Sequence, residues 1–151
     1  MIQLRTLLIA STLAASLGLA ACGSPMMGNT MAVTAKLSGA NEVPALNVPG
    51  SGRLDGSFNK DTQVLTWTVT YSGLTGPVAA GHFHGPAMAG VNAGVALGFS
   101  GSMDSPIKGS ATLTAAQAAD LLAGKWYVNL HTAAHKGGEI RGQATVASSG
   151  H

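Results

Sequence analysis

The sequence predicts an all-β fold: an antiparallel β-sandwich or barrel with one short helix. Large apolar residues at positions 65, 67, 69 and 71 alternate with threonines, as in a strand with one buried and one polar face. The 21 glycines, with many Thr, Ser and Val residues, are typical of short strands joined by frequent turns. About eight strands fit into the roughly 115 residues that follow an N-terminal leader, which is enough chain for one core.

Each predicted element has a local signal. The helix is expected to begin after Thr114, because Gln117 completes a capping box with it. Leu121 and Leu122 would form its apolar side, and Gly124 would end it. The strands are expected at residues 32–39, 52–59, 63–73, 77–85, 95–99, 107–114, 125–132 and 138–146.

The N-terminus has the pattern of a secreted protein. Residues 1–21 contain an arginine, then an apolar run and then small residues, which predicts a signal peptide. The residues Leu19-Ala20-Ala21-Cys22 resemble the bacterial lipoprotein signal, in which the cysteine is lipidated; the alternative is an ordinary signal peptide with a chance cysteine. Cys22 is the only cysteine, so no disulfide can form within the chain.

The lipoprotein signal implies a domain order and a location. Residues 22–31 would be a lipidated flexible tether, and residues 32–147 the folded domain. Several acyl chains on Cys22 would anchor the protein stably in a membrane. By analogy with lipoprotein sorting in bacteria with two membranes, Gly23 after the cysteine indicates the outer membrane.

Composition disfavours two function classes. Charged residues make up only 9% of the chain, the net charge is +2, and there is no basic stripe, so nucleic-acid binding is not expected. Serines are abundant, but none lies in a nucleophile elbow, and the six acidic residues are scattered. No catalytic residue is therefore assigned, and whether the protein is an enzyme is left open.

Three of the five histidines point to a metal site. His82 and His84 flank the large apolar Phe83, so both are expected on the outward face of one strand, within chelating reach of a common ion. His131 falls on the outward face of the 125–132 strand, with Tyr127 and Asn129. Three imidazoles with an open position resemble a catalytic metal site more than a closed structural one. The alternative is that these histidines are simply exposed.

Other residues could complete this site. His135 is either a fourth ligand or a bystander in the loop that follows. Asn129, Glu139 and backbone carbonyl groups are candidates for holding the second ring nitrogens. Neutral imidazole binds copper, zinc, nickel and iron, so the residues by themselves leave the metal open between copper and zinc.

Four stretches carry a family resemblance. The segments LSGANEVP (37–44), HFHGPA (82–87), LTAAQAADLLAGKWYV (113–128) and WYVNLHTAAHKGGEIRGQ (126–143) resemble the CHRD domain, named for the extracellular protein chordin. The match runs from about Ala32 to Val146. The resemblance implies an immunoglobulin-like β-sandwich or barrel and an extracytoplasmic location, with no agreed biochemical activity.

A second likeness is chemical. Residues 52–85 have the order of strand, hairpin, GLT turn and H-x-H strand found in copper/zinc superoxide dismutases. That likeness implies copper binding by His82, His84 and His131, with Arg141 as a guide for an anion. The chain lacks the long zinc-binding loop and the cysteine pair of that family, so copper binding carries over more directly than the dismutase reaction.

Two functions follow from the sequence. The first is a cell-envelope lipoprotein that binds a transition metal, copper in preference to zinc, with redox or superoxide-related chemistry as an extension. The second is a non-catalytic structural or adhesion module on the outer membrane, in which the histidines only shape a loop. A protein partner is not identified by either reading.

Overall fold

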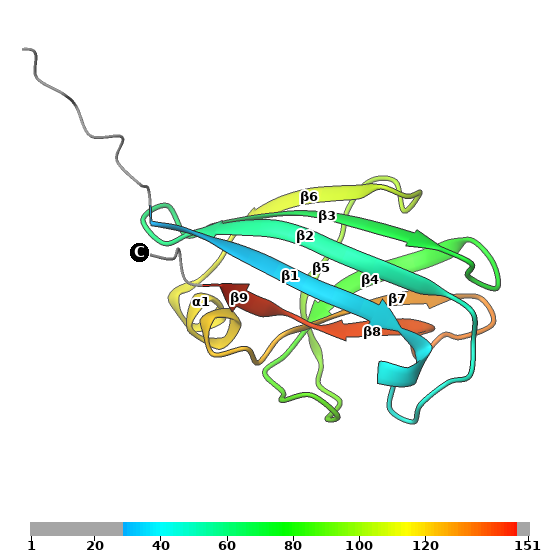
Figure 1. Cartoon of the computed structure of the whole chain (residues 1–151). Coiled ribbons are helices and arrows are strands. Elements are labelled where there is room, and N and C mark those ends of the chain that lie inside the picture. Colours follow the sequence, from blue (N-terminus) through cyan, green and yellow to red (C-terminus); the bar gives the residue numbers. More distant parts are fainter. Residues whose placement is uncertain (1–28, 148–151) are drawn as a thin grey trace, which may run out of the picture.

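The computed structural model describes residues 29–147, which form an antiparallel β-sheet that curls into a half-barrel, with one short helix at one end (Figure 1). The all-β class with one short helix is therefore confirmed. The elements are β1 (Thr30–Ser38), η1 (Gly39–Asn41), β2 (Ser51–Asn59), β3 (Val64–Ser72), β4 (Val78–His84), β5 (Val95–Gly98), β6 (Ile107–Thr112), α1 (Ala115–Leu122), β7 (Tyr127–Thr132), β8 (Ile140–Gln143) and β9 (Thr145–Ala147).

Some sequence predictions lie beyond this part of the chain. The predicted signal peptide at residues 1–21 and the lipidation site at Cys22 are outside the described residues. Among residues 29–147, no helix has the length and apolar character needed to cross a membrane.

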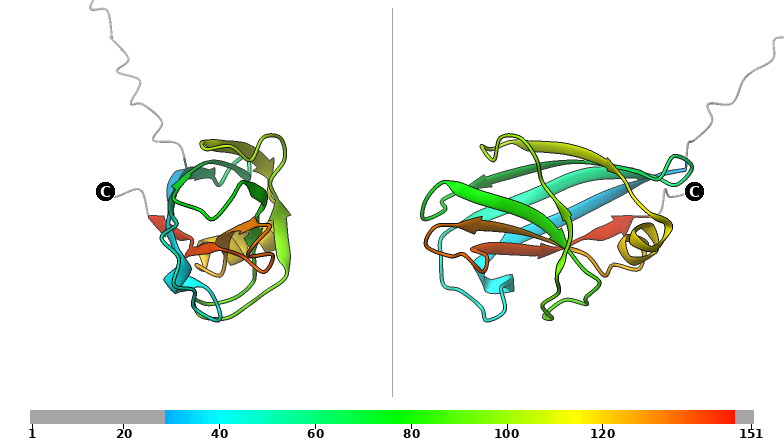
Figure 2. Two further views of the ribbon diagram at one scale, coloured as in Figure 1. Left: turned by 90° about the vertical axis from the view of Figure 1, so that its right-hand side faces the viewer. Right: turned by 180° about the vertical axis from the view of Figure 1, so that it is seen from behind.

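The topology brings distant parts of the chain together. The strand order is β5-β4-β7-β8-β1-β2-β3-β6, and β9 also pairs with β1. Strands β1, β2 and β3 are sequential neighbours. Strand β4 instead pairs with β7, which follows it by more than forty residues. Seen end-on, the sheet wraps around a common interior (Figure 2).

An aromatic cluster fills the interior and links the two edges of the sheet. Phe83 of β4 is fully buried and meets Trp67 of β3 edge-to-face, with ring centroids 5.3 Å apart. Phe99, just after the edge strand β5, stacks on the same Trp67 at 5.3 Å. Trp126 lies 5.5 Å from Phe83. These contacts come from opposite sides of the curled sheet, so they hold the half-barrel in its curved form.

The helix begins where the sequence predicts. The Thr114 hydroxyl accepts a hydrogen bond from the Gln117 N–H, and the Gln117 side chain accepts one from the Thr114 N–H, which together make the predicted capping box. Leu121 is buried in the core, whereas Leu122 is 39% exposed. The apolar side of the helix is therefore narrower than predicted, with Ala118 in place of Leu122.

The capping hydroxyl gives a measurable prediction. Thr114→Ala should lower the free energy of unfolding by about 1 kcal/mol, because the N–H of Gln117 loses its acceptor. Thr114→Ser keeps the hydroxyl and should lie within a few tenths of a kcal/mol of the wild type. Chemical denaturation of both variants measures this difference. Equal destabilisation by Ala and Ser would show that the cap contributes nothing.

The last predicted strand is divided in two. Residues 138–146 were expected to form one strand, but β8 ends at Gln143 and β9 begins at Thr145. The break falls where pairing with β7 ends: Gln143 is opposite Tyr127, the first residue of β7, and the Ala144 N–H donates to the Trp126 carbonyl just before that strand, at 2.9 Å. Strand β8 pairs with β7 and, at Arg141, with β1, whereas β9 pairs with β1 alone, and the sheet has nine strands in place of about eight.

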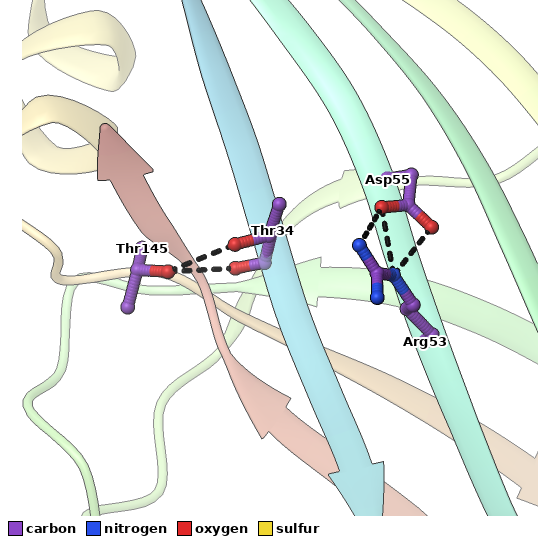
Figure 3. A network of polar contacts seen from close by, with 4 residues as sticks. All are labelled: Thr34, Arg53, Asp55 and Thr145. Carbon is purple, nitrogen blue, oxygen red and sulfur yellow. Dashed lines mark hydrogen bonds and ion pairs between the residues drawn. The ribbon is translucent and has the colours of Figure 1, made fainter. Parts of the chain in front are cut away.

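The outer surface of β1 and β2 carries a small polar network (Figure 3). The Thr145 hydroxyl donates to the Thr34 carbonyl at 3.1 Å and lies 3.2 Å from the Thr34 hydroxyl, which attaches β9 to β1. Beside it, Arg53 pairs with Asp55, with an N–O distance of 2.6 Å. Both charged side chains are more than half exposed, so water screens the pair and we assign it no role in stability.

Candidate metal centre

Strands β4 and β7 position three histidines on one face of the sheet. His82 and His84 alternate with the buried Phe83, so both point away from the core. Strand β7 runs antiparallel beside β4, with Asn129 opposite His82 and Ala80 opposite His131. His131 is thus the diagonal neighbour of His82, at a separation that long side chains bridge.

The three rings converge on one another. The nearest ring nitrogens, His82 Nδ1 and His131 Nε2, are 3.2 Å apart. Ring centroids lie 5.0 Å apart for His82 and His131 and 5.5 Å apart for His82 and His84. One nitrogen from each ring falls within 4.8 Å of the other two. All three side chains are partly buried, so the group is reached from solvent but is not freely hydrated.

Backbone carbonyls fix the proton positions on two rings. His84 Nδ1 faces the Ala93 carbonyl at 3.1 Å, and His131 Nδ1 faces the Lys136 carbonyl at 3.0 Å. A carbonyl only accepts, so Nδ1 must carry the proton in both rings and Nε2 keeps its lone pair. The His84 Nε2 atom is buried and has no hydrogen-bond partner among the described residues. A buried acceptor without a donor is the feature expected of a ligand atom.

The surroundings of His82 and His84 favour the neutral form of both rings. Burial lowers the pKa of His82, and the neighbouring His131 and His84 lower it further. Burial is also the main cause that lowers the pKa of His84, with contributions from His131 and Arg141, against an opposing hydrogen bond to Ala93. A neutral imidazole has the lone pair that a metal ion requires, so both groups remain competent ligands below the ordinary histidine pKa.

The spacing suits a metal ion. Metal–nitrogen bonds of about 2.0–2.1 Å place ligand nitrogens within about 4.2 Å of each other, so small side-chain rotations would gather these three. His82 Nδ1 now faces His131 Nε2, and holding an ion there requires that the His82 proton sit on Nε2 instead. Three neutral imidazoles would leave at least one coordination position open.

Tyr127 and Arg141 form a stack behind His84. The Tyr127 ring lies parallel to His84, with centroids 4.9 Å apart and an angle of 4° between planes. The Arg141 guanidinium carbon lies 3.5 Å from the Tyr127 ring centroid on a neighbouring strand. Arg141 is 2% exposed and donates to the Asn92 side chain at 2.8 Å and the Val91 carbonyl at 2.5 Å. Arg141, which the sequence predicted as a guide for an anion, thus lies under the 85–94 loop and holds that loop in position.

The remaining predicted site residues lie around the three histidines without joining them. Among residues 29–147, the group of possible metal ligands consists of His82, His84 and His131 and does not include His135. The backbone N–H of His135 donates to the Thr132 hydroxyl at 3.2 Å. Asn129 is buried and donates to Glu42 at 2.6 Å. Of the predicted partners for the second ring nitrogens, backbone carbonyls are the ones that contact Nδ1 of His84 and His131.

Glu139 is fully buried and serves a neighbouring loop. Its carboxylate accepts hydrogen bonds from the Thr75 N–H at 2.8 Å, the Thr75 hydroxyl at 2.7 Å and the Thr132 hydroxyl at 2.6 Å. Burial opposes ionisation of this group, but the hydrogen bonds from Thr132 and Thr75 outweigh it, and the pKa of Glu139 is lowered. The carboxylate therefore ties the β3–β4 loop to the end of β7.

Glu42 is a buried acid that the sequence analysis did not assign to the site. It lies just after η1, is 8% exposed, and accepts one hydrogen bond, from Asn129. Burial raises its pKa to about 7, against the lowering effects of Asn129 and Arg141. Its side chain lines a cavity of about 300 Å³ between η1 and the 85–94 loop, with Arg141 and Gln143.

Glycine at position 138 is required beside this group. Gly138 has a φ of +125°, which L-residues with a side chain rarely adopt. A Cβ there would collide with the Asn129 side chain. The absence of a side chain at 138 thus allows Asn129 to reach Glu42 under the β7–β8 loop.

The family follows from a comparison with known proteins. The family model of the CHRD domain matches residues 33–144, which is well over half of the chain. The chain belongs to the CHRD domain family. No curated protein and no solved structure matches it. The CHRD domain in this chain thus places three histidines so that they could hold a metal ion.

Sequence reasoning missed two residues that shape the centre. Tyr127 alternates with Asn129 and His131, so the period of β7 already placed it on the histidine face. Its parallel contact with His84 depends on the pairing of β4 with β7. Glu42 lies in the NEVP stretch. The sequence signal that could have identified it is an acidic residue in a chain with few charges.

Proposed function

We propose that this protein is a cell-envelope lipoprotein whose CHRD domain binds one transition-metal ion, copper in preference to zinc, through His82, His84 and His131. One observation carries the proposal. Three ring nitrogens from two strands lie within 4.8 Å of one another, and backbone carbonyls hold the protons of His84 and His131 on Nδ1, so that Nε2 of each ring carries a lone pair.

Copper is favoured by ligand chemistry. Among divalent first-row metals, a nitrogen site binds Cu²⁺ most tightly, and imidazole suits copper and zinc alike. The described part of the chain adds no thiolate or carboxylate to the group, so nothing shifts it toward a closed zinc site. An ion with an open position could exchange electrons with a small oxidant, which is the basis for redox or superoxide-related chemistry as an extension.

The envelope location rests on the N-terminal sequence. Residues 1–21 with the Leu19-Ala20-Ala21-Cys22 pattern support export and lipidation at Cys22, and Gly23 supports the outer membrane. Labelled palmitate should be incorporated by the wild type and not by Cys22→Ser, and the wild type should fractionate with membranes. Palmitate incorporation by Cys22→Ser would contradict the anchor.

The metal proposal is tested by titration with Cu(II), followed by electron paramagnetic resonance. The wild type should bind one copper with nitrogen hyperfine structure, and both His131→Ala and the double variant His82→Ala/His84→Ala should lose it. His135→Ala is the matched control, because it removes a nearby histidine outside the group and should bind as the wild type does. Stoichiometric copper binding by the double variant would refute the assignment.

The effect of added metal on thermal stability is an independent measurement, and it distinguishes metal binding from the alternative of an adhesion module. An ion that binds only the folded state, present at a hundredfold excess over Kd, stabilises it by about 2.7 kcal/mol. Copper or zinc should therefore raise the Tm of the wild type but not of the double variant. No shift with either metal would favour a structural or adhesion module, in which His84 and His131 serve only to bind the loop carbonyls of Ala93 and Lys136.

A further inference from the structure

We propose that Tyr127 is a positioning residue for this centre: it holds the ring plane and the Nδ1-protonated form of His84, and Arg141 holds Tyr127. The inference rests on the proposed metal site and deepens it. It concerns a side chain that touches a ligand residue and is not itself a ligand.

The ring of Tyr127 restricts the His84 ring from one side. The two rings are parallel to within 4°, with centroids 4.9 Å apart, and they face each other directly across the β4–β7 ladder. A parallel contact of this kind opposes rotation of the imidazole about χ2, because any rotation would drive one ring edge into the other. The direction of the His84 Nε2 lone pair is therefore set in part by Tyr127.

The hydroxyl of Tyr127 acts on the same histidine by a second route. The Tyr127 hydroxyl accepts a hydrogen bond from the Ala93 N–H at 3.1 Å and donates one to the Ala93 carbonyl at 3.3 Å. That carbonyl is the acceptor for His84 Nδ1. By holding Ala93, Tyr127 keeps the carbonyl where it fixes the His84 proton on Nδ1 and leaves Nε2 for a metal ion.

Arg141 completes the arrangement from the other face of the tyrosine. Its guanidinium lies over the Tyr127 ring and also donates to the Val91 carbonyl and the Asn92 side chain, two residues and one residue before Ala93. The Asn92 side chain in turn donates to the Val43 carbonyl at 3.1 Å. The loop that supplies the Ala93 carbonyl is thus attached to β8 and to the segment after η1, and Tyr127 lies at the centre of these contacts.

The test compares two tyrosine variants of the full chain. Tyr127→Phe keeps the ring and removes the hydroxyl; Tyr71→Phe is the matched control, because the Tyr71 hydroxyl also donates to a loop carbonyl, that of Met103, at 2.8 Å. Tyr127→Phe should bind Cu(II) about tenfold more weakly than the wild type, as expected when a group that orients a ligand is lost, with altered nitrogen hyperfine couplings. Tyr71→Phe should match the wild type in both measurements.

A second measurement, of the His84 tautomer, needs no metal. It can therefore test the role of Tyr127 even if the three histidines bind no metal ion. In the metal-free wild type, ring ¹⁵N chemical shifts should show His84 protonated on Nδ1, and Tyr127→Phe should show a mixture of the two tautomers. Tyr127→Leu, which also removes the ring, should increase this mixing. An unchanged His84 tautomer in Tyr127→Phe, or copper affinity and spectra equal to those of Tyr71→Phe, would overturn the proposal.

Discussion

Replacing Phe83 by alanine is expected to lower the free energy of unfolding by about 3–5 kcal/mol, the range for removing a buried phenylalanine. Phe83 is fully buried and touches Trp67, Phe99 and Trp126, with ring centroids 5.3–5.5 Å away. Trp67 lies in β3, Phe99 just after β5 and Trp126 just before β7, so these rings are held by different parts of the sheet and can close the space only in part. A cavity should therefore remain. Chemical denaturation of the variant measures the loss.

The substitution Phe83→Ala should also disturb the candidate metal centre. Phe83 lies between His82 and His84, and its burial determines which face of β4 the two histidines occupy. Copper binding should therefore weaken in Phe83→Ala. Phe58→Ala is the matched control, since Phe58 is also fully buried but lies on β2, away from the histidines. It should lose comparable stability and keep its copper affinity. Equal loss of copper affinity in both would show that the effect is general destabilisation.

Replacing Glu42 by glutamine is expected to change how stability depends on pH. The pKa of Glu42 is about 7 in the folded state against 4.5 for a free glutamate side chain. The folded state thus holds the proton more tightly than the unfolded state, so this group stabilises the protein at low pH and the contribution is lost as the pH rises from 4.5 through 7. At about 1.36 kcal/mol per pH unit, the loss is up to about 3 kcal/mol.

Glutamine removes the charge and keeps an acceptor oxygen for Asn129. The stability of Glu42→Gln relative to the wild type should therefore increase by up to about 3 kcal/mol between pH 4.5 and pH 8. Denaturation of both proteins across this range measures the difference. His82 and His84, with lowered pKa values, give the opposite trend, because their contribution is lost as the pH falls below 6.5; they are present in both proteins and cancel.

Glu139→Gln provides the contrasting case. The pKa of Glu139 is lowered, so its contribution is present above 4.5 and is lost as the pH falls below that value. Its variant should be less stable than the wild type across the whole range from pH 4.5 to 8. A difference between Glu42→Gln and the wild type that stays constant with pH would show that Glu42 ionises as an ordinary exposed glutamate does.

The sequence predicted the local parts of the fold because these depend on short-range patterns. Alternation in β3 and β7, the Thr114–Gln117 capping box and the position of His82 and His84 on one face all follow from residues close in sequence. The break at Ala144 did not, because it falls where β7 ends as a neighbouring strand and only β1 continues beside β9. Residues 138–146 alone do not show where the strand beside them ends.

Candidate ligands were predictable, whereas their surroundings were not. The period of β7 placed His131 on the outward face, but its 3.2 Å approach to His82 depends on a strand pairing across 49 residues. The outward face was expected to carry polar chemistry under loops, yet Tyr127, Asn129 and Arg141 are almost fully buried there. Loop coverage is set by contacts between distant segments, such as Asn92 with Val43, and alternation carries no information on these.

The fold class, the strand faces and the histidines on those faces follow from the amino-acid pattern, since a two-residue period in apolar side chains sets which groups lie on which side of a strand. Three features appear only in the folded chain: β4 lies beside β7, the carbonyls of Ala93 and Lys136 hold protons of His84 and His131, and Glu42 is buried. Strand pairing, the positions of loop carbonyls and desolvation all arise from contacts between residues far apart in the chain, and the pattern within one strand does not encode such contacts.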